Sequence, residues 1–134
     1  MTHGITRAIR FIQAQVDALP DGRCQALVQV ERVGQGPTTG TAQGGSGQAD
    51  ALRAVARATG DALSEAYHDA GVKIRVRGVQ QVEAFGQLVV IVSLAATRGG
   101  DTRSLLGVCD GTGDPARATA LAVLNGTNRF LGLE

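Results

Sequence analysis

Residues 8–19 read AIRFIQAQVDAL, and residues 73–85 read KIRVRGVQQVEAF. The two stretches correspond at an offset of about 65 residues, with Ile-Arg near the start of each. Towards their ends, VDAL at residues 16–19 matches VEAF at residues 82–85. A pattern that returns in this way predicts a duplicated structural unit.

A glycine cluster follows each of the two stretches. GTAQGGSGQ at residues 40–48 matches GVCDGTGD at residues 107–114, and each cluster runs into a segment rich in Ala and Leu. We therefore predict a pseudo-twofold domain, with repeat 1 at about 5–70 and repeat 2 at about 71–131.

The composition is that of one globular domain over residues 1–134. The hydrophobic fraction is 43% but the aromatic fraction is only 3%, so the core is predicted to consist of Val, Ile, Leu and Ala. A net charge of +1 gives no reason to expect a nucleic-acid partner, and no apolar run is long enough to span a membrane. The N-terminus lacks the apolar segment of a signal peptide. Cys24 and Cys109 are only two and far apart, so they are expected to be small buried thiols in a reducing cytoplasm, not a disulfide.

Hydrophobic patterning predicts three strands and a helix, twice over. Residues 5–19 have apolar residues at helical spacing, but their repeat partner is rich in β-branched residues, which favours strands for both. Residues 88–95 are apolar on both faces, so this strand is expected to be central or to lie in an interface. The fold class predicted is α+β, with two βββα units of antiparallel sheet and helices on one face. The predicted strands are 5–19, 24–32, 38–43, 72–83, 87–97 and 102–109, and the predicted helices are 48–70 and 114–131.

The two glycine loops are candidate ligand sites. Each loop precedes a helix, where exposed N–H groups and the helix dipole attract a carboxylate or a phosphate. Neither loop matches the phosphate-binding lysine motif or a dinucleotide fingerprint. Asp17 and Glu83, at equivalent strand ends, are candidates for binding an ammonium group. Glycines that merely turn a strand into a helix, and solvated turn carboxylates, remain the alternative interpretations.

The chain offers few residues for catalysis. His3 lies near the N-terminus and His68 on the predicted first helix, and neither has a metal-ligand spacing with Cys or a carboxylate. Ser46 lies between glycines but lacks the nucleophile-elbow pattern and a histidine partner. We therefore expect a non-catalytic protein with no metal and no cofactor.

These motifs together resemble the regulatory, or allosteric dimerisation, domain of 2-isopropylmalate synthase and of its relatives citramalate synthase and homocitrate synthase. The resemblance covers roughly residues 6–131. Its motifs are TAQGGSGQADALRAV at 41–55, the strand turn EAFGQ at 83–87, and the segment from 107 to 125 that ends in Leu-Asn. The catalytic barrel of the family, with its metal ligands and acetyl-CoA chemistry, has no counterpart in the chain.

The resemblance implies a homodimeric module that binds an end-product amino acid such as leucine or isoleucine. It implies that helix N-termini hold the carboxylate, an acidic residue holds the ammonium group, and alanine gives a close apolar fit. The site residues carried over by resemblance are Gly45, Gly47, Ala49, Asp50, Glu83, Ala84, Gly113 and Asp114. A separate synthase catalytic subunit is a further implied partner.

Two alternatives stay open. The first is a structural dimerisation or interaction domain without a ligand, favoured by Gln48 and Asp110, which stand where the family has proline and an apolar residue. Convergence of Asp50, Glu83 and Asp114 on one cleft would distinguish ligand binding from this alternative. The second is a fragment of an acetyl-CoA-dependent 2-isopropylmalate synthase, an acyltransferase.

Overall fold

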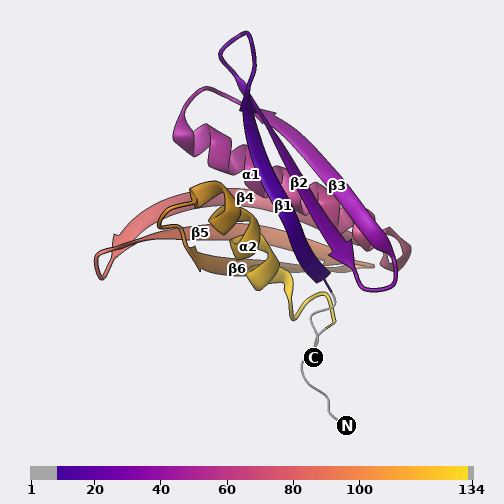
Figure 1. The fold of residues 1–134 in the computed structure, drawn as a ribbon. Helices are drawn as coiled ribbons and strands as arrows, with labels where there is room; N and C mark the ends of the chain where they lie inside the picture. The colour runs from indigo at the N-terminus through magenta and orange to yellow at the C-terminus, as the bar shows by residue number, and fades with distance from the viewer. Residues whose placement is uncertain (1–8, 133–134) are drawn as a thin grey trace.

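The fold is a duplicated βββα unit, seen in a computed structural model that describes residues 9–132 (Figure 1). Each unit forms its own antiparallel sheet, with strand orders β1-β2-β3 and β4-β5-β6, and each sheet is followed by a helix. The predicted α+β class and the two βββα units are confirmed. The elements are β1 (Ile9–Ala18), β2 (Cys24–Arg32), β3 (Gly36–Gly44), α1 (Gln48–Ala66), β4 (Val72–Ala84), β5 (Gln87–Arg98), β6 (Asp101–Asp110) and α2 (Pro115–Thr127).

The two units pack against each other reciprocally. Helix α1 packs on β2 and β3 of its own sheet and also contacts β4, the first strand of the second unit. Helix α2 packs on β5 and β6 and also contacts β1, the first strand of the first unit. The two helices also contact each other, and one core of small aliphatic residues runs through both units. This reciprocity gives the molecule its pseudo-twofold symmetry.

The first strand shows why its sequence imitates a helix. Residues 9–18 form strand β1, as the repeat predicts, and a β-bulge shifts the register between Phe11 and Gln13. The bulge makes Ile12 an extra residue, so the inward side chains fall at Ile9, Phe11, Ala14 and Val16 instead of alternating strictly. The predicted first part of this strand, residues 5–8, lies outside the described residues.

Strand β4 carries the same bulge, between Val76 and Gly78. When the two bulges are matched, the repeat alignment taken from the sequence is wrong near the strand ends. Val16 faces inward, opposite Ala26 of β2, whereas Val82 pairs with Val89 on the outer face of its sheet. The match of Val16 with Val82 is therefore out by one residue, which in a strand reverses the face. The same shift means that Asp17 and Glu83 are not equivalent.

Glycines in the third strand of each unit seat the helices. A Cβ atom added to Gly40 of β3 would lie 1.9 Å from the carbonyl oxygen of Ala58 in α1. A Cβ atom added to Gly107 of β6 would lie 1.8 Å from the carbonyl oxygen of Ala122 in α2. The matched glycines of the two repeats thus let each helix backbone touch its own sheet.

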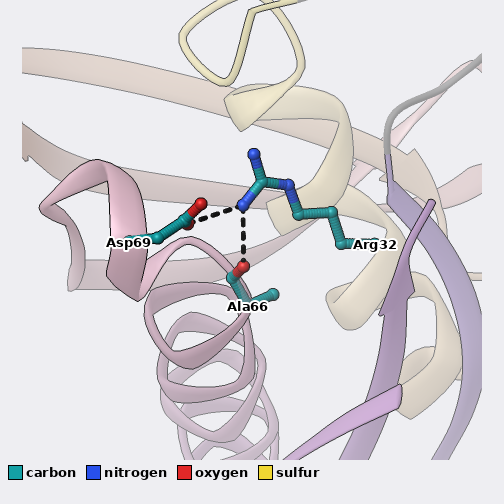
Figure 2. A network of polar contacts seen from close by, with 3 residues as sticks. All are labelled: Arg32, Ala66 and Asp69. Atoms are coloured by element: carbon teal, nitrogen blue, oxygen red, sulfur yellow. Dashed lines mark hydrogen bonds and ion pairs between the residues drawn. The ribbon is translucent and has the colours of Figure 1, made fainter. Parts of the chain in front are cut away.

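Helix α1 ends earlier than the sequence predicts. The helix stops at Ala66, and a short 3-10 helix at His68–Ala70 leads to Gly71, whose φ of 69° ends the segment. Arg32 at the end of β2 donates hydrogen bonds from Nη1 to the carbonyl oxygen of Ala66 (3.1 Å) and to Oδ1 of Asp69 (2.7 Å), as Figure 2 shows. The guanidinium group thereby satisfies a carbonyl at the helix C-terminus that has no helical partner.

Three further expectations can be compared with the structure. Asp114 caps α2 and Pro115 is its first residue, as predicted, but the helix ends at Thr127 and not at residue 131. Strand β3 begins at Gly36, inside the turn predicted for residues 34–37. Strand β5 is the central strand of its sheet, as its apolar sequence predicts. In the described part of the chain, no helix combines the length and the hydropathy needed to cross a membrane.

Candidate functional site

The two helix N-termini meet at one pocket. The pocket has a volume of about 590 Å³ and lies where the first turn of each helix approaches the β1–β2 hairpin. Both glycine loops contribute to its wall. The lining residues are Val16, Ala18, Gly22, Arg23, Cys24, Ser46, Gly47, Gln48, Ala51, Leu52, Gly113, Asp114, Pro115 and Ala116.

Helix α1 begins at the pocket without a side-chain cap. Gly47 is the N-cap residue, with extended backbone angles and no side-chain cap hydrogen bond, and Asp50 is the acidic residue of the first turn. The first N–H groups of any helix have no helical partner, and they carry the positive end of the helix dipole. Since Gly47 and Gln48 line the pocket, this end of it favours a negatively charged group.

The N-terminus of α2 has the opposite character. The carboxylate of Asp114 accepts a hydrogen bond from the backbone N–H of Arg117 at 3.0 Å, so this helix is capped by its own side chain. The loop before it is held by a hydrogen bond from the N–H of Thr112 to Oδ1 of Asp110 (2.9 Å). That bond, the largest cause, holds the pKa of the Asp110 carboxyl below its usual value. Asp114 lines the pocket and is exposed, so the pocket has a carboxylate at its α2 side.

The β1–β2 hairpin supplies the basic side chain of the pocket. Arg23 lines the pocket, and its backbone N–H donates to Oδ1 of Asp21 at 3.0 Å, which fixes the turn. Apolar residues from a strand and from both helices, namely Val16, Leu52 and Ala116, complete the wall. An uncapped helix end and an arginine thus share one apolar pocket with a carboxylate.

The structure places the eight predicted site residues in three groups. Gly47, Gly113 and Asp114 line the pocket. Gly45, Ala49 and Asp50 lie beside it, in the first loop and the first turn of α1, but do not line it. A Cβ atom at Gly45 would lie 2.6 Å from Oδ2 of Asp50, so the Asp50 carboxylate lies against this glycine.

The last two predicted residues, Glu83 and Ala84, lie at the far end of β4, next to the β4–β5 turn. Neither lines the pocket, and Glu83 is exposed. Of Asp50, Glu83 and Asp114, Asp114 alone lines the pocket, so the convergence that would distinguish ligand binding from a structural domain is not found.

Sequence reasoning missed Arg23 and the apolar wall of the pocket. The turn at Pro20-Asp21-Gly22 is visible in the sequence, but nothing in it indicates that the hairpin approaches two helix N-termini. Gln48, named above only as a departure from the family, also lines the pocket, and its Nε2 donates to Oε1 of Gln81 in β4 at 3.3 Å.

Of the cysteines and histidines in the described residues, Cys24 alone lines the pocket. Cys24 and Cys109 are both free; Cys24 is buried, as predicted, whereas Cys109 is only half-buried. Burial, followed by the nearby Asp110 charge, raises the pKa of the Cys109 thiol. His68 lies in the short 3-10 helix, and His3 lies outside the described residues. Across residues 9–132, no group of three or more His, Cys, Asp or Glu side chains is placed to hold a metal ion.

A scan against protein-family models and a search of curated proteins both find no match for the chain. The kind of ligand that the pocket binds is therefore inferred from the residues that line it.

Proposed function

We propose that this protein is a non-catalytic regulatory module that binds a small amino acid in the pocket between its two helix N-termini. One observation carries the proposal: the two glycine loops, which are far apart in the sequence, line the same pocket. Pockets with a largely apolar wall and a few convergent polar groups are the usual form of a small-molecule site.

Each part of an α-amino acid has a suitable partner in this pocket. The carboxylate is placed at the uncapped N-terminus of α1, where Gly47 and Gln48 begin the helix, with Arg23 as a charged partner. The ammonium group is placed beside the carboxylate of Asp114. An aliphatic side chain is placed against Val16 and Leu52. This arrangement favours a branched-chain amino acid such as leucine or isoleucine.

The proposed biological role follows the resemblance to the regulatory domain of 2-isopropylmalate synthase. The duplicated βββα architecture supports it. In this role the protein senses the end product of amino-acid biosynthesis in the cytoplasm, as a homodimer, and acts on a separate catalytic subunit.

A thermal-shift screen against the twenty amino acids tests the proposal. A ligand present at 100 times its dissociation constant stabilises the folded protein by about 2.7 kcal/mol, which is a clear rise in Tm. We expect a shift with an aliphatic amino acid and none with its amide or its 2-oxo acid, since each lacks one of the two charged groups. A flat screen, confirmed by equilibrium dialysis at millimolar concentration, would refute ligand binding.

Two aspartate variants locate the site. Asp114→Asn keeps a good N-cap residue on α2 but removes the charge, so we expect weaker binding by tenfold or more with little change in Tm. Asp50→Asn is the matched control. Asp50 lies in the first turn of α1, which borders the pocket, but Asp50 itself does not line the pocket. Loss of binding in Asp50→Asn with normal binding in Asp114→Asn would place the ligand elsewhere.

A second candidate function is a structural interaction domain that has no small-molecule ligand. The positions of Asp50 and Glu83 outside the pocket favour it. A flat ligand screen would leave this candidate, whereas any acetyl-CoA condensation by the purified chain would refute both functions.

A further inference from the structure

The two sheets of the molecule have different outer faces, although they arise from one duplicated unit. Outward positions follow from the register, because they pair with each other and alternate with the inward core residues. The outer face of the first sheet is mostly polar: Gln13, Gln15, Asp17, Gln25, Leu27, Gln29, Thr39 and Thr41. The outer face of the second sheet has an apolar centre, formed by Val82, Val89, Ile91, Leu106 and Val108.

The contrast is sharpest at matched positions of the third strands. Gly40 and Gly107 occupy the same place under their helices, so their neighbours are equivalent. Thr39 corresponds to Leu106, and Thr41 corresponds to Val108. Leu106 is 70% exposed and Val108 is 51% exposed. Large aliphatic side chains gathered on one solvent face are a mark of an interaction surface.

The charges at the two ends of the face are complementary. At one end, the Arg77 guanidinium crosses the face and donates from Nη1 to the Ser104 hydroxyl oxygen at 3.2 Å. Arg75 lies at the same level of the sheet, opposite Ala95. At the other end, Asp110 lies opposite Val89, and its carboxylate is exposed.

A twofold axis brings these ends together. Sheets that pack face to face keep their strands nearly aligned. A twofold axis that lies between the two faces, perpendicular to the strands, places β6 of one copy over β6 of the other with the strand direction reversed. The Asp110 end of one copy then lies above the Ser104 end of the second copy. Arg77, held at Ser104, is thereby placed to pair with Asp110 of the second copy.

We propose that the outer face of the β4-β5-β6 sheet binds a second copy of this chain, in an antiparallel dimer with Arg77–Asp110 pairs across it. The face has roughly 350 Å² in projection, from strand spacing and rise, and its accessible area is larger because side chains protrude. Two copies together give roughly 700 Å² in projection, below the size of about 1,000 Å² of a stable specific interface, which is the size range of weak and transient contacts. The dimer is therefore expected to be reversible, with micromolar affinity.

Light scattering after size exclusion tests the surface. At about 100 μM the unmodified chain should have twice its 13.8 kDa mass and should dissociate on dilution. Leu106→Glu should be monomeric at this concentration. Thr39→Glu, the same change at the matched position of the polar sheet, should remain dimeric. A monomeric unmodified chain, or two variants that behave alike, would overturn the proposal.

Charge reversal tests the antiparallel arrangement. Arg77→Asp and Asp110→Arg should each weaken dimerisation by tenfold or more, because each places like charges together. The double variant should recover most of the loss, since it restores the pairs with their signs exchanged. Circular dichroism separates these effects from misfolding, because Asp110 also holds the loop before α2. Failure of the double variant to recover would refute the proposed orientation.

The dimer surface and the ligand pocket are separate, so ligand binding and dimerisation can fail independently, although a monomeric chain would also remove the homodimer from the proposed function. The pocket lies at the helix N-termini, and none of its lining residues belongs to β4, β5 or β6. Leu106→Glu should therefore retain the amino-acid thermal shift while it loses the dimer mass.

Discussion

Adding one methyl group under helix α2 tests how the two repeats hold their helices. Gly107→Ala would place a Cβ atom 1.8 Å from the carbonyl oxygen of Ala122 and 2.9 Å from the backbone nitrogen of Gly126. Real Cβ atoms essentially never approach other heavy atoms closer than 3.0 Å, so the helix must move away by roughly 1.2 Å. The neighbouring atoms are backbone, so no change of side-chain rotamer relieves the contact.

The expected loss is at the upper end of overpacking effects, about 3 kcal/mol in the free energy of unfolding. For a chain of this length, that corresponds to a fall in Tm of roughly 9–15 °C. Gly40→Ala should behave alike, because its Cβ atom would lie 1.9 Å from the carbonyl oxygen of Ala58.

Urea and thermal unfolding monitored by circular dichroism, at one protein concentration, measure the effect. Gly100→Ala is the matched control, because its Cβ atom would have nothing within 4 Å and its φ is not in the left-handed region. The control should lie within about 0.5 kcal/mol of the unmodified chain. If Gly107→Ala is no less stable than Gly100→Ala, the helix does not rest on the strand backbone as described.

Three further predictions concern single side chains. Asp114→Ala should destabilise the fold by about 1 kcal/mol through loss of the α2 cap, whereas Asp114→Asn should not, as urea titrations would show. The hydrogen bond from Arg32 holds the pKa of the Asp69 carboxyl below its usual value of 3.8. The ionised carboxylate therefore stabilises the folded state above pH 3.8, and this stabilisation is lost as the pH falls through the pKa that Asp69 has in the folded protein. Arg32→Gln should remove that pH dependence from the unfolding curves, and an unchanged acid limb would contradict this. Cys109, whose thiol pKa is raised by burial, should react slowly with iodoacetamide at neutral pH and faster as the pH rises, and Asp110→Asn should increase the rate.

Local patterns were enough to predict the secondary structure and its duplication. The β-branched residues of 72–82 and the Asp114-Pro115 start of α2 act through their own backbones and near neighbours, so their effects are visible in the sequence. The bulges were not visible. An extra residue such as Ile12 changes which face every later side chain occupies, and the sequence records only a disturbed alternation.

The candidate site was predictable only in part, because it is assembled from segments far apart in the chain. The glycine loops before α1 and α2 were identified from their repeat, and Gly47, Gly113 and Asp114 do line the pocket. Arg23 was not identified, since its role depends on where the β1–β2 hairpin packs. Asp50 follows the same loop motif, but its carboxylate lies against Gly45 and close to Gly47, and Asp50 itself does not line the pocket.

The sequence by itself determined that the chain is a tandem βββα repeat, because hydrophobic period, turn glycines and caps are local properties. Tertiary structure alone decided that the two helix N-termini share one pocket. It also decided that Val82, Leu106 and Val108 gather on one outer face. Both outcomes follow from the reciprocal packing of two units and from strand register. These are long-range properties, since a shift of one residue in pairing exchanges the buried face for the exposed one.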